Sequence, residues 1–275
     1  MRNLQSHFTF CTVLLRLFLL LMLLAGGWDS CLAAQPALAD SAALGLRPPT
    51  HHGRGVALRI AVPSALLAVG VLAHSPAYNQ TLYQAKQDIQ AETQEVFTGF
   101  DAHGLDDYTR HVPLAAAYAL MATGHRGARS AVGFTLIYLV AHELDEGVVS
   151  HLKRLAAEAR PNNPADLSSF PSSHTAQAFL TATLLHEQYG RQYPWVSVSG
   201  YAVAAATGTM RVLGNKHWAT DVLAGAAIGF LSAETVWHLY PALTRLLPER
   251  LAHKLLLVPT YVPGAGAGLA LAIRP

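Results

Sequence analysis

Six apolar stretches constrain what this chain of 275 residues can fold into. A helix that crosses a bilayer needs about 20 apolar residues, and most of these stretches are shorter. They are rich in Ala and Leu, and the alternation typical of strands is nearly absent, so each stretch predicts a helix. The stretches are residues 60–73, 112–122, 131–141, 176–185, 196–207 and 222–237. The pattern predicts an all-α bundle of about six apolar helices.

Composition limits the classes of protein to consider. The chain is 52% hydrophobic and 13% charged, which is apolar for a soluble protein but mild for a dense membrane bundle. We therefore expect membrane association and leave the number of spans open. The net charge of +2 gives no sign of nucleic acid binding. The two cysteines, Cys11 and Cys31, precede the body of the chain, so it has no disulfide framework and no cysteine-based metal site.

The N-terminal region is typical of an export signal. Arg2 and Arg16 make a basic start, residues 17–25 are apolar, and small residues offer cleavage near 33 or 39. We expect a signal peptide over 1–39, with an uncleaved membrane anchor as the alternative. An aperiodic loop should link it, over 40–54, to a helical domain over 55–250.

Two further segments complete the expected organisation. Residues 75–110 are polar and acidic, and residues 81–98 within them predict an exposed or amphipathic helix. The tail over 251–275 contains Gly and Pro and is expected to hold a short strand or an extended arm.

Three polar clusters lie in the apolar second half of the chain, each at the end of an expected helix. The clusters are Lys153 with Arg160, the run 169–174, and Arg211 with His217 and Asp221. In an up-and-down bundle these three helix ends fall on the same side. Taken singly, each cluster also fits an ordinary helix cap or a surface charge. Their order along the chain favours one shared site in a core segment over 153–221.

The residue types in these clusters suit a phosphate. Arg offers a planar fork of donors and Lys a point charge, so three cations can bind phosphate oxygens. Ser172 after Pro171 is expected to be the N-cap of a helix whose free N–H groups form an anion site. His217 and Asp221 are four residues apart, which predicts that they share one helix face and that the carboxylate orients the imidazole.

The same residues resemble a known family. Lys153-x6-Arg160-Pro161, Pro171-Ser172-Ser173-His174 and Arg211-x5-His217-x3-Asp221 are similar to the three signature motifs of the type 2 phosphatidic-acid phosphatase and vanadium haloperoxidase superfamily. That family is all-α, and its phosphatases need no metal. The resemblance covers about 153 to 221 and the helices around that segment.

The resemblance implies a role for each residue. His217 is implied as the nucleophile, Asp221 as its orienting carboxylate, and His174 as the acid that protonates the leaving oxygen and later activates water. The implied phosphate ligands are Lys153, Arg160, Ser172, the backbone of Ser173, and Arg211. Two positions depart from the family pattern: Ser173 replaces a glycine, and Met210 replaces a serine. Ser173 keeps the backbone N–H provided that its φ is negative.

The function implied is hydrolysis of a phosphomonoester or diphosphate through a phosphohistidine, with no metal and no other cofactor. Lipid-linked substrates are expected, such as phosphatidic acid, phosphatidylglycerol phosphate, an isoprenyl diphosphate or a lipid A phosphate. A soluble periplasmic acid phosphatase and a vanadate-dependent haloperoxidase are the alternatives. A non-enzymatic membrane scaffold is a further alternative, although it would not need three cations and two histidines at one end of a bundle.

Two topology signals conflict if all six stretches span a membrane. The basic loop 125–129 and the basic tail would lie on the cytoplasmic side, with the motifs outside. A cleaved signal would instead leave the new N-terminus outside and the motifs, three spans later, inside. Either the stretch 60–73, which contains Pro63, does not span, or the bundle is largely periplasmic. Both solutions predict an active site that faces the periplasm.

Overall fold

The computed structural model describes residues 52–246, 255–262 and 266–273. Within these residues the six predicted apolar stretches are all helical. They correspond to α3 (His52–Leu72), α6 (Val112–Ala122), α7 (Ala131–Ala156), α8 (Ser173–Tyr189), α9 (Pro194–Leu213) and α10 (Ala219–Leu246). The predicted helical bundle is confirmed, and α4 (Gln80–Val96) and the short α5 (Leu105–Thr109) add to it.

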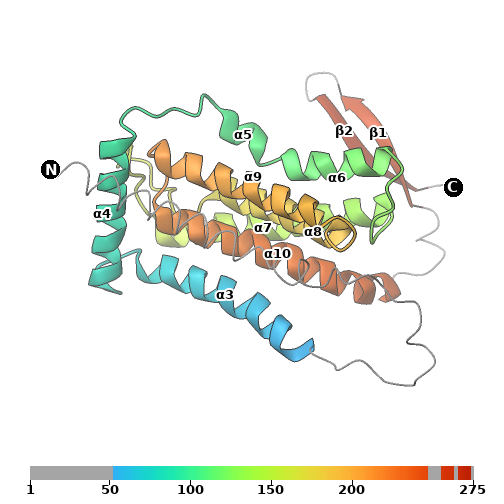
Figure 1. Cartoon of the computed structure of the whole chain (residues 1–275), viewed down its shortest axis with the longest axis horizontal. Coiled ribbons are helices and arrows are strands. Elements are labelled where there is room, and N and C mark those ends of the chain that lie inside the picture. Colours follow the sequence, from blue (N-terminus) through green and yellow to red (C-terminus); the bar gives the residue numbers. More distant parts are fainter. Residues whose placement is uncertain (1–51, 247–254, 263–265, 274–275) are drawn as a thin grey trace.

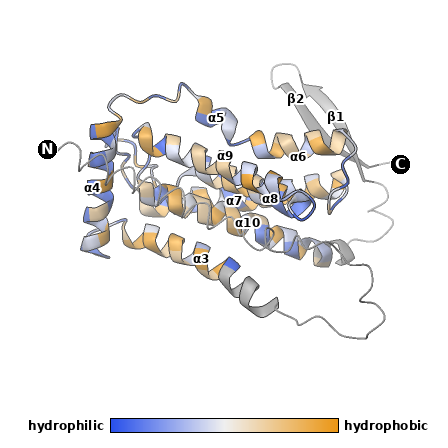
Figure 2. Ribbon diagram, in the orientation of Figure 1, coloured by the Kyte–Doolittle hydropathy of each residue, from blue (hydrophilic) through white to orange (hydrophobic). Residues whose placement is uncertain are grey.

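Helix α8 is the centre of the bundle. It packs against α6, α7, α9 and α10, and α3 packs against α10 (Figure 1). Nearly every side chain of α8 is buried, including Phe179, Leu180 and Leu184. Helix α4 stands across one end of the bundle, and Figure 2 shows that it is more hydrophilic than α3. The end that α4 covers is the one where α7 finishes and α8 and α10 begin.

Two glycines bring α8 and α10 into backbone contact. A Cβ atom at Gly229 would lie 1.9 Å from the carbonyl oxygen of Ala176, and one at Gly225 would lie 2.5 Å from that of Ser172. Any side chain at either position would push the helices apart. These glycines therefore fix the start of α8 beside the first turns of α10.

Helix α7 is longer than predicted. The apolar stretch ends near 141, but the helix continues to Ala156, so Lys153 lies in its last turn. The extension is polar on its exposed side and still buries Asp145 and Val149, which are four residues apart. A helix that is buried on one face only need not be apolar along its whole length.

The predicted segments outside the bundle can also be compared with the structure. The predicted loop over 40–54 is wrong for residues 52–54, which form the first turn of α3; residues 40–51 and the predicted signal peptide, 1–39, lie outside the described residues. The predicted helix over 81–98 is confirmed as α4. The predicted strand in the tail is also confirmed, as β1 (Leu255–Val262) pairs antiparallel with β2 (Gly266–Ile273).

One described helical segment is long and apolar enough to cross a membrane. It comprises Ala219–Ala242 of α10, and 72% of its most apolar window is buried inside the bundle. Such burial is also what the core helix of a bundle shows. The apolar parts of α3 and α6, Arg59–Leu72 and Val112–Ala122, are shorter. Pro63 lies inside the continuous helix α3 and does not interrupt it.

Candidate active site

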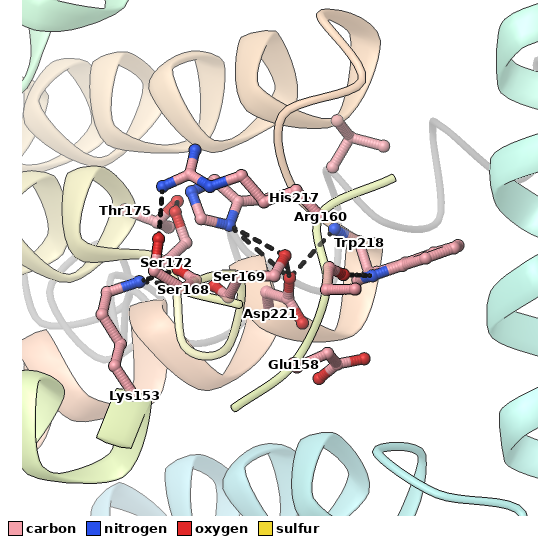
Figure 3. Close-up of polar contacts among 12 residues, drawn as sticks. Lys153, Glu158, Arg160, Ser168, Ser169, Ser172, Thr175, His217, Trp218 and Asp221 are labelled. Atoms are coloured by element: carbon pink, nitrogen blue, oxygen red, sulfur yellow. Dashed lines mark hydrogen bonds and ion pairs between the residues drawn. The ribbon is translucent and has the colours of Figure 1, made fainter. Parts of the chain in front are cut away.

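The three polar clusters meet at the end of the bundle next to α4 (Figure 3). Five of these residues are held by a helix end or by the turn beside one, whereas Arg160 lies in the loop after α7. Lys153 lies in the last turn of α7, Ser172 is the N-cap of α8, Arg211 lies in the last turn of α9, His217 lies in the turn after it, and Asp221 lies in the first turn of α10. Segments as far apart as 153 and 221 therefore surround one point.

His217 and Asp221 are paired, but not as the sequence predicted. The prediction of one shared helix face is wrong, because His217 lies in the turn before α10 and Asp221 is the third residue of that helix. The Nδ1 atom of His217 is 3.5 Å from Oδ2 of Asp221. The same Oδ2 accepts hydrogen bonds from Ser169 Oγ at 2.6 Å and from the backbone N–H of Trp218 at 3.1 Å. The bond to Trp218, the residue just before α10, is a helix-capping contact that fixes the carboxylate.

Burial sets the ionisation of this pair. Asp221 and His217 have exposed fractions of 0% and 1%. Burial raises the pKa of Asp221 to about 6, against the hydrogen bonds from Ser169 and Trp218, which lower it. Burial, and then the charge of Arg211, lowers the pKa of His217 well below its usual value. The imidazole is therefore neutral at neutral pH. With Nδ1 facing the carboxylate, Nε2 is the nitrogen left for a reacting atom.

The cations lie around His217. Lys153, Arg160 and Arg211 are all close enough to contribute to the lowering of its pKa. Burial, and then Arg160, also lowers the pKa of Lys153, to about 8. The Nζ atom of Lys153 donates to the carbonyl oxygen of Ser168 at 2.5 Å, and Arg160 Nη2 donates to Ser168 Oγ at 3.1 Å. Ser168 thus holds both side chains of the first cluster, Lys153 through its backbone carbonyl and Arg160 through its hydroxyl.

The start of α8 presents backbone N–H groups to the same point. Ser172 is the N-cap, with φ of −74° and ψ of 109°, and its Oγ lies 3.0 Å from Thr175 Oγ1. No side-chain capping bond forms at this N-cap, so the first N–H groups of α8 remain available to an anion. Among the described residues with positive φ, Ser173 does not appear, so it meets the condition for replacing a glycine. The N–H of Ser172 donates to the carbonyl of Asp221 at 3.1 Å and ties α8 to α10.

Two carboxylates at the site carry no assignment in the sequence analysis. Asp106 and Asp107 lie on the short helix α5, within the segment that the sequence marks only as polar and acidic. Asp106 is 1% exposed and accepts a hydrogen bond from Nη1 of Arg211. Burial opposes its charge, but the bond to Arg211 holds the pKa of Asp106 below its usual value. Asp107 Oδ1 is 2.6 Å from Nε2 of His174.

His174 sits between charges of both signs. Burial, and then Arg211, lowers the pKa of His174 to about 4, and the bond to Asp107 opposes this shift. In turn the bond to His174 lowers the pKa of Asp107. The two groups stabilise each other's charged forms, while the desolvation of His174 works against its own.

A second group of residues missed by the sequence analysis ties α4 to the site. Lys86 of α4 is buried and donates to Glu158, which follows α7 between Lys153 and Arg160. The Nζ atom of Lys86 also lies 5.0 Å from the ring centroid of Trp218, next to His217. His74 Nδ1 is 3.0 Å from the other oxygen of Glu158. These contacts join the segments that carry the first and third clusters.

Comparison with known proteins finds relatives of the segment that carries the three clusters. The sequence model of the PAP2 superfamily matches residues 134–245. A lipid A 1-phosphatase from Porphyromonas gingivalis is 41% identical over 131 residues, which are 47% of this chain and 29% of that protein. The chain thus spans less than a third of the length of this relative. A transmembrane PAP2-type phosphatidylglycerolphosphate phosphatase from Bacillus subtilis, known from a crystal structure, is 17% identical with a TM-score of 0.46, covering 68% of this chain and 98% of that one. The resemblance drawn from the three motifs is confirmed, since the segment that the superfamily model matches, residues 134–245, contains all of them.

Proposed function

We propose that this chain is a phosphatase that hydrolyses a lipid-linked phosphomonoester or diphosphate through a phosphohistidine on His217, without a metal. One observation carries the proposal. A buried, neutral imidazole has one nitrogen next to Asp221, while Lys153, Arg160 and Arg211 lie around it. A neutral histidine beside an orienting carboxylate is a nucleophile, and three cations around it suit the oxygens of a phosphoryl group.

In the first step Nε2 of His217 attacks phosphorus and forms the P–N bond. The bond to the leaving oxygen breaks, and His174, whose pKa the negative charge of the bound phosphate raises, donates the proton that this oxygen needs. Lys153, Arg160 and Arg211, with the N–H groups at the start of α8, hold the remaining phosphate oxygens. Asp221 stabilises the positive charge that develops on the imidazole of His217.

In the second step His174, now neutral, takes a proton from water. The resulting hydroxide attacks phosphorus, the P–N bond breaks, and phosphate leaves. His174 is again protonated and His217 again neutral, so the cycle closes without another reactant.

Two observations support a lipid-linked substrate. The relative with 41% identity over the matched segment is a lipid A 1-phosphatase. In addition, the site lies at the end of an apolar bundle whose segment Ala219–Ala242 is long enough to cross a membrane. A phosphate at the head of a lipid would reach such a site from a membrane surface. We propose membrane association for the same reasons.

The test is a phosphate-release assay with the purified protein. The panel holds phosphatidic acid, phosphatidylglycerol phosphate, an isoprenyl diphosphate, a lipid A phosphate and a soluble alkyl phosphate. We expect release from at least one lipid, undiminished by EDTA, and loss of nearly all turnover in His217→Ala. Release from the soluble ester alone would favour a soluble acid phosphatase. Full activity in a folded His217→Ala protein would refute the phosphohistidine.

Vanadate separates the phosphatase from the haloperoxidase alternative. The cations that hold phosphate should also hold vanadate, so vanadate should inhibit phosphate release without producing bromide oxidation. Strong bromide oxidation with negligible phosphate release would place the chain in the haloperoxidase class.

We also propose that the active site faces the periplasm. A phosphatase-type reporter fused after Glu158, at the end of α7, should be active. A second fusion after Arg129 distinguishes the two arrangements: it is inactive if the bundle spans the membrane and active if the bundle is periplasmic. An expressed but inactive Glu158 fusion would contradict the placement.

A further inference from the structure

Helix α5 brings a carboxylate to the histidine that acts as the acid. Asp107 Oδ1 lies 2.6 Å from Nε2 of His174, although the two residues are 67 positions apart. With the Nε2 proton donated to a carboxylate, Nδ1 is the nitrogen that remains for the substrate. The contact therefore selects one tautomer of neutral His174, the one with a lone pair on Nδ1.

The backbone of α5 is fixed on both sides of Asp107. Asp106, one residue earlier, is buried and bonded to Arg211 of α9. Thr109, two residues later, accepts a hydrogen bond from Thr207 of α9 at 2.8 Å. Asp107 itself keeps an exposed side chain, at 56%. Its position over His174 thus results from contacts made by its neighbours rather than from its own burial.

We infer that Asp107 is a positioning residue for His174, so that the site contains two histidine–carboxylate pairs, one for the nucleophile and one for the acid. This inference rests on the proposed phosphatase function. In the first step Asp107 holds His174 with Nδ1–H toward the leaving oxygen. In the second step it keeps the proton on Nε2, so that the Nδ1 lone pair accepts the proton of water.

The charges around His174 show why a carboxylate is needed. Arg211 of α9 and Arg110, at the end of α5, both disfavour its protonated form, and His217 is close enough to interact with it. Asp107 is the group facing His174 that favours the proton. Without Asp107 the pKa of His174 falls further, so less of the acid is protonated at a given pH. As the pH is raised, activity that depends on protonated His174 would then be lost at a lower pH than in the wild type.

The test compares Asp107→Asn with the wild type on two esters. An alkyl phosphate has a poor leaving group and needs the acid, whereas a nitrophenyl phosphate has a good one and needs it little. We expect the variant to lose about tenfold or more in kcat on the alkyl ester near neutral pH, with a smaller loss on the nitrophenyl ester. The fall of kcat on the basic side of the pH profile should move to lower pH, and Asp107→Glu should recover part of the loss.

Asp101→Asn is the matched control. It removes one negative charge from the exposed loop before α5 and leaves His174 untouched, so its kinetics should match the wild type. An unfolding measurement checks that Asp107→Asn is folded. Equal losses on both esters, or an unmoved pH profile, would overturn the inference while leaving the phosphatase intact. A wild type without phosphate release on any ester would instead refute the proposed function itself.

Discussion

The two histidine–carboxylate pairs of the site differ in burial and in the way the chain assembles them. His217 and Asp221 are almost fully buried, and they lie four positions apart in the sequence. The side chains of His174 and Asp107 are 20% and 56% exposed, and they come from segments 67 residues apart. In the buried pair the contact is 3.5 Å long, and Ser169 and Trp218 also hold the carboxylate.

This difference matches what each histidine must do in the proposed mechanism. A nucleophile needs one fixed tautomer, and a desolvated pair with extra hydrogen bonds keeps it. An acid that later becomes a base must exchange protons with the substrate and with water, which requires access to solvent. The exposed pair has that access, and its single 2.6 Å contact can form and break with less cost than a buried one.

The largest difference between the pairs should appear when each carboxylate becomes an amide. Asp221→Asn should lower kcat on the order of a thousandfold or more, because an amide can favour the wrong tautomer of His217 and stabilises no positive charge. The loss should be equal on alkyl and nitrophenyl phosphates, since the nucleophile serves both. The measurement is kcat for each ester, with Asp101→Asn as the control. If a folded Asp221→Asn protein lost less than tenfold in kcat, the buried pair would not orient the nucleophile.

A smaller effect should follow from removing the hydrogen bond that supports the buried carboxylate. Ser169 Oγ donates to Asp221 at 2.6 Å, and this bond lowers the pKa of Asp221 against the burial that raises it to about 6. In Ser169→Ala the pKa of Asp221 should rise. As the pH is lowered, activity that needs the ionised carboxylate should therefore be lost at a higher pH than in the wild type. We expect about a tenfold loss of kcat below neutral pH and less above it. The measurement is the kcat–pH profile.

Ser199→Ala is the control for this variant. Ser199 Oγ donates only within α9, to the carbonyl of Val196 at 3.0 Å, and lies on an exposed position. Its profile should coincide with that of the wild type. An acidic side of the profile that is the same in Ser169→Ala and the wild type would show that Asp221 does not titrate in the working range.

The comparison also shows what the sequence could predict. The buried pair and the cations were predictable, because each lies at or close to the end of a helix and the bundle brings alternate helix ends together. The position of His217 outside α10 was not predicted, although Gly214-Asn215 after α9 signals a turn and Asn215 has a φ of +55°. The turn places His217 outside α10, so spacing of four residues does not by itself mean a shared helix face.

The exposed pair was not predictable for a physical reason. The segment 75–110 contains several acidic residues, and sequence does not tell which of them folds against the bundle. The choice of Asp106 and Asp107 depends on tertiary contacts with Arg211, His174 and Thr207 that join distant segments. The same holds for Lys86 and Glu158, which are 72 residues apart. Apolar periodicity reports the buried faces of helices and carries no information on such pairs.

Salt should produce the smallest effect and should act on one pair only. Mobile ions screen exposed charges at distances near a Debye length, about 10 Å at 0.1 M salt, and screen buried charges much less. Asp107 is exposed, so added salt should weaken its attraction for the proton of His174 and lower the pKa of that histidine. The basic side of the kcat–pH profile should then move down by a few tenths of a pH unit between low and high salt, as expected for an exposed ion pair. The acidic side, which reports the fully buried Asp221, should stay in place.

Asp107→Asn is the control, because it has no charge left to screen at this position and the basic side of its profile should not move down with salt. Equal movement of both sides in the wild type would show that the two pairs do not differ in their exposure to solvent during turnover.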